Sequence, residues 1–374
     1  MQMNQIGIYF NLYIQYSGVI LFMKIILTGG GTAGHVTPNL ALAPRLKASG
    51  FEITYIGSTN GLERQLIERE NIPYYGIHAG KLRRYLDLKN LTDTVRIARG
   101  FLQALSIIAK VKPDLVFSKG GFVSCPVVWA AWTHRVPVII HESDFTPGLA
   151  NRLSLPFAKT VCYTFPETAR HFPEGKGVLT GIPVREELFR GDAAQGRALC
   201  GFGDQKPALM VIGGSQGSGV LNSAIRTNLA ALLERYQICH ICGPGNLEVA
   251  LNGQSGYRQI EYANEELPHL FAMADLVVSR AGATTLFELL ALRKPHLLIP
   301  LSKQSSRGDQ ILNARSFAKQ GFSRVLMEED LNSGSLLENL SALERDRYGY
   351  AARMSRSALS DTTEAVLQVI LKAL

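Results

Sequence analysis

The sequence contains no run of 18 or more apolar residues, the length at which a segment becomes a candidate for spanning a bilayer. Cysteine is scarce as well, with five residues scattered along the chain. That odd, scattered set argues against a disulfide framework and is typical of a reducing compartment. Cys239 and Cys242 form a Cys-x-x-Cys that no second pair follows, and the apolar residues around them predict a buried strand in preference to a zinc or redox site.

Positive charge is unevenly distributed. Residues 1–182 carry 19 Lys and Arg against 11 Asp and Glu, whereas residues 183–374 carry 20 of each. The whole net charge of +8 therefore belongs to the first half of the chain. We expect this half to face an anionic partner, which is a membrane surface, a pyrophosphate or nucleic acid. A solvated basic face without a partner is the alternative.

The first 22 residues are apolar but lack the basic start and the small-residue cleavage site of a signal peptide. A strand pattern begins immediately after Met23. We therefore interpret residues 1–22 as an extension outside the fold and Met23 as the natural start. A short membrane-seeking tail is the alternative.

From Met23 onward, short apolar runs alternate with glycine-rich turns and helical patterns. The runs KIILT, EITYIG, DLVFS, PVIIHE and TVCYT predict the strands of a first domain, residues 23–184. The runs ALMVI, QICHIC, QIEYA, DLVVS and HLLIPL repeat the pattern in a second domain, residues 185–358. Fully apolar strands between helices are typical of parallel sheets covered on both faces. The sequence thus predicts an α/β protein of two doubly wound parallel-sheet domains, with ligands bound in the cleft between them.

The connection between the domains and the end of the chain also have recognisable patterns. We expect a hinge region between Pro183 and Phe202. Residues 359–374 predict an amphipathic helix that Ser360 or Asp361 caps, and this helix could pack back on the first domain.

The segment GGGTAGH, residues 29–35, follows the first strand and precedes a helix. Glycines there allow positive φ and let backbone N–H groups approach an anion at the start of a helix. A nicotinamide dinucleotide site would also need an acidic residue at the end of the second strand, and ITYIGSTNG offers none. The loop therefore predicts a phosphate-bearing ligand of another kind, with a tight turn as the alternative.

Two further loops of this type occur in the second half. The segment GGSQGSG, residues 213–219, offers backbone donors and the hydroxyl of Ser215 to a diphosphate. The segment SRAGATTLFE, residues 279–288, predicts a strand end, a turn at Gly282 and a helix start near Thr284. Glu288 lies about one turn into that helix, where its carboxylate could accept two hydrogen bonds from a ribose diol. A helix-dipole role is the equal alternative for Glu288.

Other polar residues stand at expected strand ends. Asp309 and Gln310 form an acid–amide pair suited to reading sugar hydroxyls. His35 and His141 could each accept a proton from an attacking hydroxyl near neutral pH, although most histidines are structural.

A basic segment, GKLRRYLDLKN at residues 80–90, combines Lys81, Arg83 and Arg84 with Tyr85. Apolar residues at helical spacing follow it, at Leu91, Val95, Ala98, Leu102 and Leu105. Basic residues interleaved with aromatic ones can bind nucleic acid or an anionic membrane. Since the chain has no nucleic-acid-binding module, we expect a membrane surface and no nucleic acid. A charged loop before an ordinary core helix is the alternative.

Seven motifs in order and with matching spacing resemble the MurG family, the UDP-N-acetylglucosamine–N-acetylmuramyl-(pentapeptide) pyrophosphoryl-undecaprenol N-acetylglucosaminyltransferases of bacterial peptidoglycan synthesis. They run from Met23 to about Leu374 and read MKIILTGGGTAGHVTPNLALAPRL, SKGGFVSCPVV, PVIIHESDFTPGLANR, TGIPVR, GGSQGS, ADLVVSRAGATTLFE and GDQILNA. The resemblance implies the GT-B fold and an inverting glycosyltransferase, peripheral on the cytoplasmic face of the cell membrane. It implies UDP-N-acetylglucosamine as donor, a lipid-linked muramyl-pentapeptide as acceptor, and neither metal nor cofactor.

The same resemblance implies roles for individual residues. His35 becomes the general-base candidate, with Glu142 and His141 as rivals, and Glu288 is implied for the ribose. The remaining substrate-binding residues that it implies are Thr32, Ala33 and Gly34 near sugar and acceptor, Arg185 and Ser215 on the diphosphate, Asn264 on the uracil side, Ala283, Thr284, Thr285, Leu286 and Phe287 along the nucleotide, and Gln310 on the donor sugar.

The chain departs from the family pattern at two positions. Asp144, in HESD, is the residue that the resemblance implies for a sugar contact, but it stands where the family often has Asn in HEQN. An ionised acid cannot donate a hydrogen bond as an amide does. Phe122 stands where Tyr is common, which removes a hydroxyl.

Three other functions fit parts of the pattern. A nucleotide-sugar epimerase shares fold and donor but needs no lipid acceptor. A glycosyltransferase of the same fold with another lipid acceptor remains open. A membrane-docking protein without activity would not need Arg185, Glu288 and Gln310 together.

Overall fold

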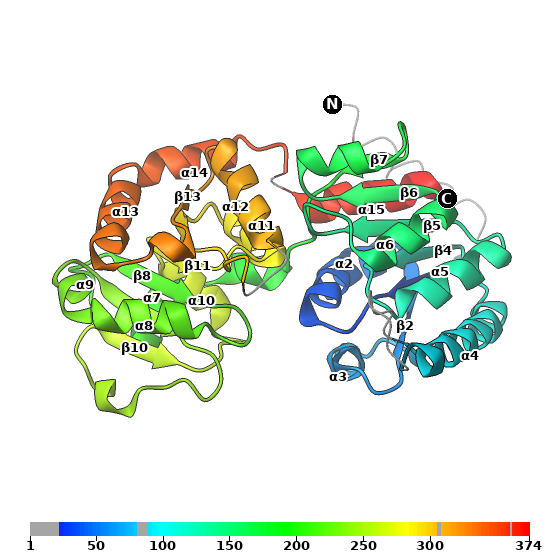
Figure 1. The fold of residues 1–374 in the computed structure, drawn as a ribbon, viewed down its shortest axis with the longest axis horizontal. Coiled ribbons are helices and arrows are strands. Elements are labelled where there is room, and N and C mark those ends of the chain that lie inside the picture. The colour runs from blue at the N-terminus through cyan, green and yellow to red at the C-terminus, as the bar shows by residue number, and fades with distance from the viewer. Residues whose placement is uncertain (1–21, 81–88, 305–307, 360) are drawn as a thin grey trace.

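The computed structural model describes residues 22–80, 89–304, 308–359 and 361–374. Within these residues the strands form two parallel sheets, one in each lobe of the molecule (Figure 1). The first sheet has the order β3-β2-β1-β4-β5-β6-β7. Its strands are β1 (Met23–Thr28), β2 (Phe51–Ser58), β3 (Tyr74–Ile77), β4 (Leu115–Ser118), β5 (Val138–Glu142), β6 (Thr160–Tyr163) and β7 (Gly177–Leu179).

Consecutive residues of these strands are buried because helices cover both faces of the sheet. In β1, Ile25 and Leu27 face one apolar cluster and Ile26 faces another, and all three have no exposed surface. On the first face lie α2 (Thr37–Ala48), α3 (Leu62–Arg69) and α15 (Thr362–Ala373). The opposite face carries α4 (Lys89–Val111) and α5 (Ser124–Thr133), with α6 (Leu149–Ser154) packed against α5. The short helices of this lobe are η1 (Ala33–His35), η2 (Leu155–Phe157) and η3 (Pro166–His171).

The second sheet has the order β10-β9-β8-β11-β12-β13. Its strands are β8 (Ala208–Ile212), β9 (Gln237–Ile241), β10 (Tyr257–Ile260), β11 (Leu276–Ser279), β12 (His296–Leu298) and β13 (Arg324–Val325). One face carries α8 (Gly219–Thr227), α9 (Leu229–Arg235) and α13 (Ser333–Arg345). The other carries α7 (Ala193–Cys200), α10 (Leu267–Met273), α11 (Ala283–Ala291), α12 (Asp309–Lys319) and α14 (Arg347–Ser355). The short helices are η4 (Glu186–Arg190), η5 (Val249–Leu251) and η6 (Glu328–Asp330). The predicted α/β class with two doubly wound parallel sheets is confirmed.

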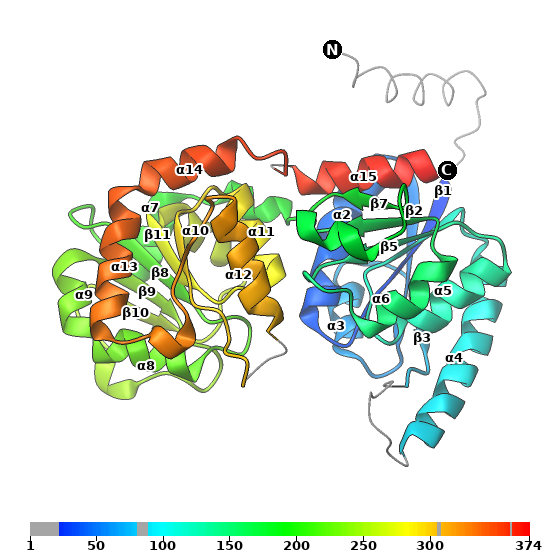
Figure 2. The ribbon, with the colours of Figure 1, turned by 45° about the horizontal axis from the view of Figure 1, so that its top comes forward.

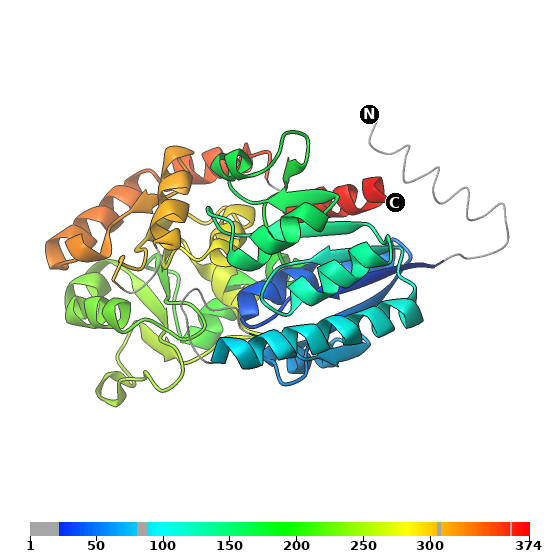
Figure 3. The same ribbon diagram turned by 45° about the vertical axis from the view of Figure 1, so that its right-hand side comes forward.

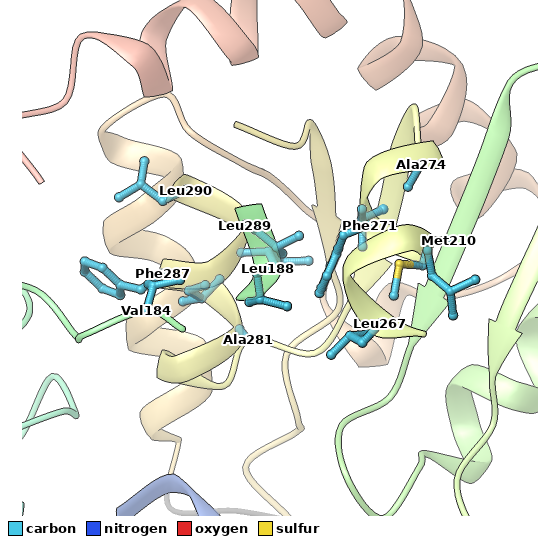
Figure 4. Packing of buried hydrophobic residues seen from close by; sticks show 14 of the residues in the cluster. Val184, Leu188, Met210, Leu267, Phe271, Ala274, Ala281, Phe287, Leu289 and Leu290 are labelled. Atoms are coloured by element: carbon cyan, nitrogen blue, oxygen red, sulfur yellow. The ribbon is translucent and has the colours of Figure 1, made fainter. Parts of the chain in front are cut away.

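The chain crosses between the lobes over a shorter segment than residues 183–202, the predicted hinge region. Val184 and Leu188 are already buried in the core of the second lobe. Figure 4 shows Leu188 between Leu289 of α11 and Phe271 of α10. Because α7 also packs against α10, the residues after Arg185 belong to the second lobe and only those close to it connect the two.

The chain crosses back before α15, which lies on the first lobe in line with α14 (Figure 2). Asp361 caps α15 by accepting a 3.0 Å hydrogen bond from the backbone N–H of Glu364. The helix buries Val366 and Ile370 in the same cluster as α2 and β1. Near both crossings, Arg45 of α2 donates to Glu186 at 2.6 Å and to Glu364 at 3.3 Å. Arg45 thereby links α2 both to η4, at the start of the second lobe, and to the first turn of α15.

Aromatic residues join the two lobes beside these crossings. Phe165, just after β6, contacts Phe287 of α11 and Phe317 of α12, with ring centroids 6.1 and 6.0 Å apart. Nearby, Glu167 accepts a 2.9 Å hydrogen bond from Ser316 of α12. The carboxyl end of β6 therefore faces the helices that follow β11 and β12. This places the carboxyl edges of both sheets toward the region between the lobes.

Helix α4 runs along the outside of the first lobe (Figure 3). Its buried contacts come from Ala104 and Ile108, whereas Val95 is 52% and Leu102 64% exposed. The predicted apolar stripe is therefore divided: Leu105 packs against the core cluster, whereas Val95 and Leu102 do not. The helix turns these side chains outward because Ala104 and Ile108 occupy the sheet-facing positions. Within the described residues, no helix is both long and apolar enough to cross a membrane.

Candidate active site between the two lobes

The first glycine loop joins β1 to α2 at the carboxyl edge of the first sheet. Gly31 has φ +87°, a backbone conformation that glycine adopts without strain. A Cβ atom at Gly29 would lie 2.6 Å from the carbonyl oxygen of His35, and one at Gly30 would lie 2.5 Å from Glu63 Oε1. The backbone of the loop therefore requires glycine at position 29, whereas a larger residue at position 30 would displace the carboxylate of Glu63. Glu63 also accepts a hydrogen bond from the Gly31 N–H at 3.3 Å.

His35 lies at the end of η1, with Thr32 and Gly34 exposed before it. Burial lowers the pKa of His35 from 6.5 to about 4, and the positive charge of Lys119 lowers it further. A hydrogen bond to the Lys119 backbone and the charge of Glu63 act against this decrease in pKa. The imidazole is therefore neutral at pH 7. Its Nδ1 atom is covered and has no hydrogen-bond partner in the described part of the chain.

The two rivals for the proton-accepting role have other partners. His141 on β5 has no exposed surface, and its Nε2 atom lies 2.7 Å from the carbonyl oxygen of Gly181. Burial lowers the pKa of His141 well below 6.5. Glu142 accepts hydrogen bonds from the backbone N–H of Asp144 at 2.9 Å and of Gly148 at 3.0 Å, and from the Asn151 amide at 2.8 Å. Both oxygens of Glu142 thus hold the loop after β5.

The second glycine loop, residues 213–218, connects β8 to α8. Gly217 has φ +75°, and a Cβ atom there would lie 2.0 Å from the carbonyl oxygen of Cys242. Ser215 lies exposed at the turn of this loop. Ser218 caps α8, and its hydroxyl accepts hydrogen bonds from Arg280 Nε at 3.1 Å and Nη2 at 2.6 Å. Arg280 is buried and also lies 2.5 Å from Glu328. Sequence reasoning placed Arg280 only at a strand end and missed that it braces this loop.

The third glycine turn begins α11. The N-cap residue, Gly282, has no side chain. The backbone N–H groups of the first helical turn, from Ala283 to Thr285, therefore receive no side-chain cap from it. Such amides at a helix N-terminus favour an anion. Leu286 and Phe287 bury their side chains in the core, with 0% and 1% exposure. Any contact of these two residues with a nucleotide would therefore come from their backbone.

Glu288 and Arg185 contact each other. Arg185 Nη2 donates a 3.0 Å hydrogen bond to Glu288 Oε1, and the carboxylate side chain is 9% exposed. Burial raises the pKa of Glu288, while the charge of Arg185 and its hydrogen bond lower it. The pair brings together the two residues predicted for the diphosphate and for the ribose, although they are 103 positions apart.

Gln310 connects the ends of two strands. Its Oε1 atom accepts hydrogen bonds from the backbone N–H of Ala281 at 3.2 Å and of Leu301 at 3.1 Å. The carbonyl end is thus turned to the protein, which leaves the amide nitrogen as the group suited to a sugar hydroxyl. Asn264 is exposed before α10, where its backbone N–H donates to Glu266 at 3.2 Å.

The structure therefore gathers the predicted residues in two groups. His35, Glu142 and Asp144 lie at the carboxyl edge of the first sheet, and the Arg185–Glu288 pair, Ser215 and Gln310 lie at the corresponding edge of the second. Lys81, Arg83, Arg84 and Tyr85 lie outside the described residues. Across the described residues, no group of three or more His, Cys, Asp or Glu could hold a metal ion. Helix-start amides and a guanidinium on one side, with a neutral imidazole on the other, suit transfer of a group from a diphosphate to a hydroxyl.

Comparison with known proteins decides the family. Residues 25–163 match the glycosyltransferase family 28 N-terminal domain, and residues 208–369 match its C-terminal domain. One relative, from Clostridium perfringens, is 54% identical over 350 residues, which cover 94% of this chain and 98% of the relative. It is a UDP-N-acetylglucosamine–N-acetylmuramyl-(pentapeptide) pyrophosphoryl-undecaprenol N-acetylglucosamine transferase. The chain belongs to the MurG family, within glycosyltransferase family 28.

Solved structures agree with this assignment. MurG from Acinetobacter baumannii matches with a TM-score of 0.74 and 26% identity, over 94% of this chain and 99% of that one. A UDP-N-acetylglucosamine 2-epimerase from Neisseria meningitidis matches with a TM-score of 0.68 but only 13% identity, over 94% of this chain and 100% of that one. The epimerase shares the fold alone. As a MurG-family member with both family 28 domains, the chain is a glycosyltransferase with the GT-B fold.

Proposed function

We propose that this chain transfers N-acetylglucosamine from UDP-N-acetylglucosamine, with inversion, to the lipid-linked muramyl-pentapeptide lipid I, giving lipid II for peptidoglycan synthesis. The observation that carries this proposal is the 54% identity to a relative named for this activity, over nearly the full length of both chains. The site supports it because each group that such a transfer needs has a candidate residue at the facing edges of the two sheets.

The second lobe binds the donor in this proposal. The amides at the start of α11 and the guanidinium of Arg185 hold the diphosphate, whose negative charge grows as the bond to the sugar breaks. Glu288 binds the ribose diol, and Gln310 donates its amide to the sugar while its oxygen stays fixed to two backbone N–H groups. Ser215 adds a hydroxyl on the diphosphate. Asn264 lies on the uracil side.

The first lobe binds the acceptor. The attacking hydroxyl gives its proton to His35 as it displaces the diphosphate from the anomeric carbon, so the base and the leaving group lie on opposite faces of the sugar. The imidazole of His35 is neutral at pH 7, so that it has a ring nitrogen free of a proton. Thr32, Ala33 and Gly34 supply the loop that meets the sugar and acceptor.

The outer face of the first lobe meets the membrane in this proposal, which makes the enzyme peripheral at the cytoplasmic face of the cell membrane. Val95 and Leu102 are exposed on the same face of α4, about two turns apart, with the exposed Arg99 between them. Exposed apolar side chains mixed with basic ones favour an anionic bilayer surface. The basic segment with Lys81, Arg83, Arg84 and Tyr85 immediately precedes this helix in the sequence.

The experiment is an incubation of the full chain with labelled UDP-N-acetylglucosamine, with and without lipid-linked muramyl-pentapeptide. We expect UDP release and a labelled lipid product only when the acceptor is present. Conversion of the sugar without acceptor would overturn the proposal in favour of an epimerase, whose fold the chain shares. Transfer to a different lipid acceptor, but not to the muramyl-pentapeptide, would overturn the assignment of the acceptor. The assignment of UDP-N-acetylglucosamine as donor would stand.

A further inference from the structure

A buried carboxylate lies directly against the first glycine loop. Glu63, in the first turn of α3, has no exposed surface. It accepts hydrogen bonds from the backbone N–H of Ser58 at 2.9 Å, from the Ser58 hydroxyl, and from the backbone N–H of Gly31 at 3.3 Å. None of these three donors carries a formal charge. Because burying a carboxylate costs free energy that its hydrogen bonds must offset, a position of this kind calls for an explanation beyond packing.

Three glycines from three segments leave room for this side chain. A Cβ atom at Gly30, in the first glycine loop, would lie 2.5 Å from Glu63 Oε1. A Cβ atom at Gly57 of β2 would meet Glu63 Cγ at 2.9 Å and the Tyr74 hydroxyl, and one at Gly61, the N-cap of α3, would overlap with Oε1. None of these three glycines has a positive φ. They are therefore needed for space and not for backbone freedom, and the space is occupied by Glu63.

Other side chains hold the carbonyl groups of the same loop. The Tyr55 hydroxyl of β2 donates to the carbonyl oxygen of Gly29 at 2.8 Å. The Asn39 amide of α2 donates to the carbonyl oxygen of Thr28 at 3.2 Å. These two contacts fix the start of the loop, where it leaves β1, whereas Glu63 holds an N–H group further along.

Gly31 is the point at which the loop turns toward the acceptor side of the site. It has φ +87°, and Thr32 and Gly34 follow it with exposed positions. The turn closes when the His35 N–H donates a 3.1 Å hydrogen bond to the Thr32 carbonyl. Where Gly31 lies therefore determines where the residues from Thr32 to His35 lie. The glycine pattern predicted an anion at the N–H groups of this loop, and at Gly31 that anion is the protein's own carboxylate.

We propose that Glu63 is a positioning residue for the acceptor: its buried carboxylate takes the place of a substrate anion at the Gly31 N–H and holds the Thr32–His35 turn in the orientation that meets the acceptor hydroxyl. The proposal rests on the proposed function, in which this turn binds the acceptor and His35 takes its proton. Glu63 acts through the loop and does not touch the substrate. Two consequences follow: the phosphates of the acceptor do not bind at the Gly31 N–H, and donor binding by the second lobe does not depend on Glu63.

The test compares four variants. Glu63→Gln keeps the shape of the side chain but turns an NH₂ group toward neighbours that are all donors. Gly61→Ala displaces the carboxylate from outside the glycine loop. Glu68→Gln makes the same change as the first variant at an exposed position of α3. Ile67→Ala removes buried apolar contacts one turn further along that helix and controls for loss of stability, which the urea midpoint measures.

Kinetics with the lipid acceptor give the first readout. In Glu63→Gln and Gly61→Ala, kcat/KM for the acceptor should fall by on the order of 10- to 100-fold, because a displaced turn misplaces the attacking hydroxyl. UDP affinity by calorimetry should be unchanged in all four variants. Ile67→Ala should lower the urea midpoint and keep the acceptor kinetics, and Glu68→Gln should change neither. Unchanged acceptor kinetics in a folded Glu63→Gln protein, or acceptor kinetics that simply follow the urea midpoint across the variants, would overturn the proposal.

Hydrogen exchange of the Gly31 amide, followed by NMR, gives a second readout that needs neither substrate. This amide should exchange slowly in the unmodified protein and about tenfold faster or more in Glu63→Gln and Gly61→Ala. Free exchange in the unmodified protein would overturn the proposal even if neither variant folds. Failure of lipid-dependent transfer would count against the proposed function, whereas a freely exchanging Gly31 amide in an active enzyme would count only against Glu63.

Discussion

Arg185 Nη2 donates a 3.0 Å hydrogen bond to Glu288 Oε1 at the point where the chain passes from the first lobe into the second. Arg185 precedes η4, and Glu288 lies in α11, whose first turn offers free amides to an anion. A nucleoside diphosphate that places its ribose on Glu288 and its diphosphate on Arg185 would exchange this ion pair for two contacts with the ligand. In the proposed function, the ion pair would hold both side chains close to their ligand-binding positions before the donor arrives.

Replacing Glu288 with Ala should weaken donor binding. The variant loses a buried charged acceptor and leaves Arg185 without its partner, which should cost roughly 1.5–3 kcal/mol of UDP affinity. We expect a higher KM for the donor and weaker binding of UDP by calorimetry. Glu187→Ala, at an exposed position of η4, is the matched control and should bind UDP normally. Unchanged UDP affinity in Glu288→Ala would show that Glu288 does not bind the ribose.

Replacing Arg185 with Ala should lower both kcat and donor affinity, because the guanidinium stabilises the charge that develops on the leaving diphosphate. Arg185→Lys should restore only part of the activity, since an ammonium is a point charge and cannot bind with two parallel N–H groups. The measurement is kcat and donor KM for both variants. Arg190→Ala, at an exposed position of the same short helix, serves as control. Full activity of Arg185→Lys would argue against a bidentate contact of Arg185 with the diphosphate.

Replacing His35 with Ala should reduce kcat by on the order of 10²–10⁴ and leave UDP binding nearly unchanged. Since the pKa of His35 is lowered to about 4, the acidic limb that it causes in the pH profile of kcat/KM should lie well below 6.5. Activity is present above the pKa and lost as the pH falls through it. His141→Ala and Glu142→Gln should instead destabilise the protein, because each holds neighbouring backbone. If the acidic limb is lost only in one of these two variants, the residue replaced in that variant is the base and His35 is not.

Acid should destabilise the protein before its carboxylates titrate. Burial lowers the pKa of His296 from 6.5 to about 4 and that of His240 to about 3, and it lowers the pKa of His141 well below 6.5. Below pH 6.5 the unfolded chain therefore binds more protons than the folded one. The stability that these neutral, buried histidines contribute is fully present above pH 6.5 and is lost as the pH falls toward their pKa values in the folded protein. We expect the urea midpoint to decrease between about pH 7 and about pH 5.

A pair of variants isolates the contribution of one histidine to this acid sensitivity. His296→Gln should show a shallower decrease of the urea midpoint with pH than the unmodified protein, whatever its stability at neutral pH. His134→Gln, at an exposed position, should show the original slope. Equal slopes in all three proteins would exclude His296 from the acid sensitivity.

Much of the fold could be predicted because its signals are local. The strands β1, β4, β5, β8, β9 and β11 coincide with apolar runs in the sequence, and each glycine loop follows a strand. The strands β3, β7 and β13 were not predicted. β3 carries two tyrosines, and the other two are only three and two residues long, so none of them produces a clear apolar run. The face of α4 could not be assigned either, because a helical stripe shows periodicity without showing which side meets the sheet.

The candidate site divides in the same way. The order of motifs was enough to single out His35, Arg185, Glu288 and Gln310, because the glycine turns that position them are encoded within a few residues. Sequence patterns gave no sign of Lys119 or Arg280 as buried cations, since burial depends on neighbours from other strands. The core position of Phe287 likewise depends on contacts with Phe317 of the same lobe and with Phe165 of the first lobe, and only the docking of the two lobes creates the second contact.

Two parallel-sheet domains, with glycine loops at the ends of their first strands, follow from local sequence, because backbone freedom and apolar periodicity act over a few residues. The pairing of Arg185 with Glu288, the burial of Lys119 beneath the first glycine loop and the return of α15 to the first lobe follow only from the folded structure. These contacts join positions far apart in the chain. The pKa values and the burial that give the site its chemistry come from such neighbours, which exist only once the sheets have assembled and the lobes have packed together.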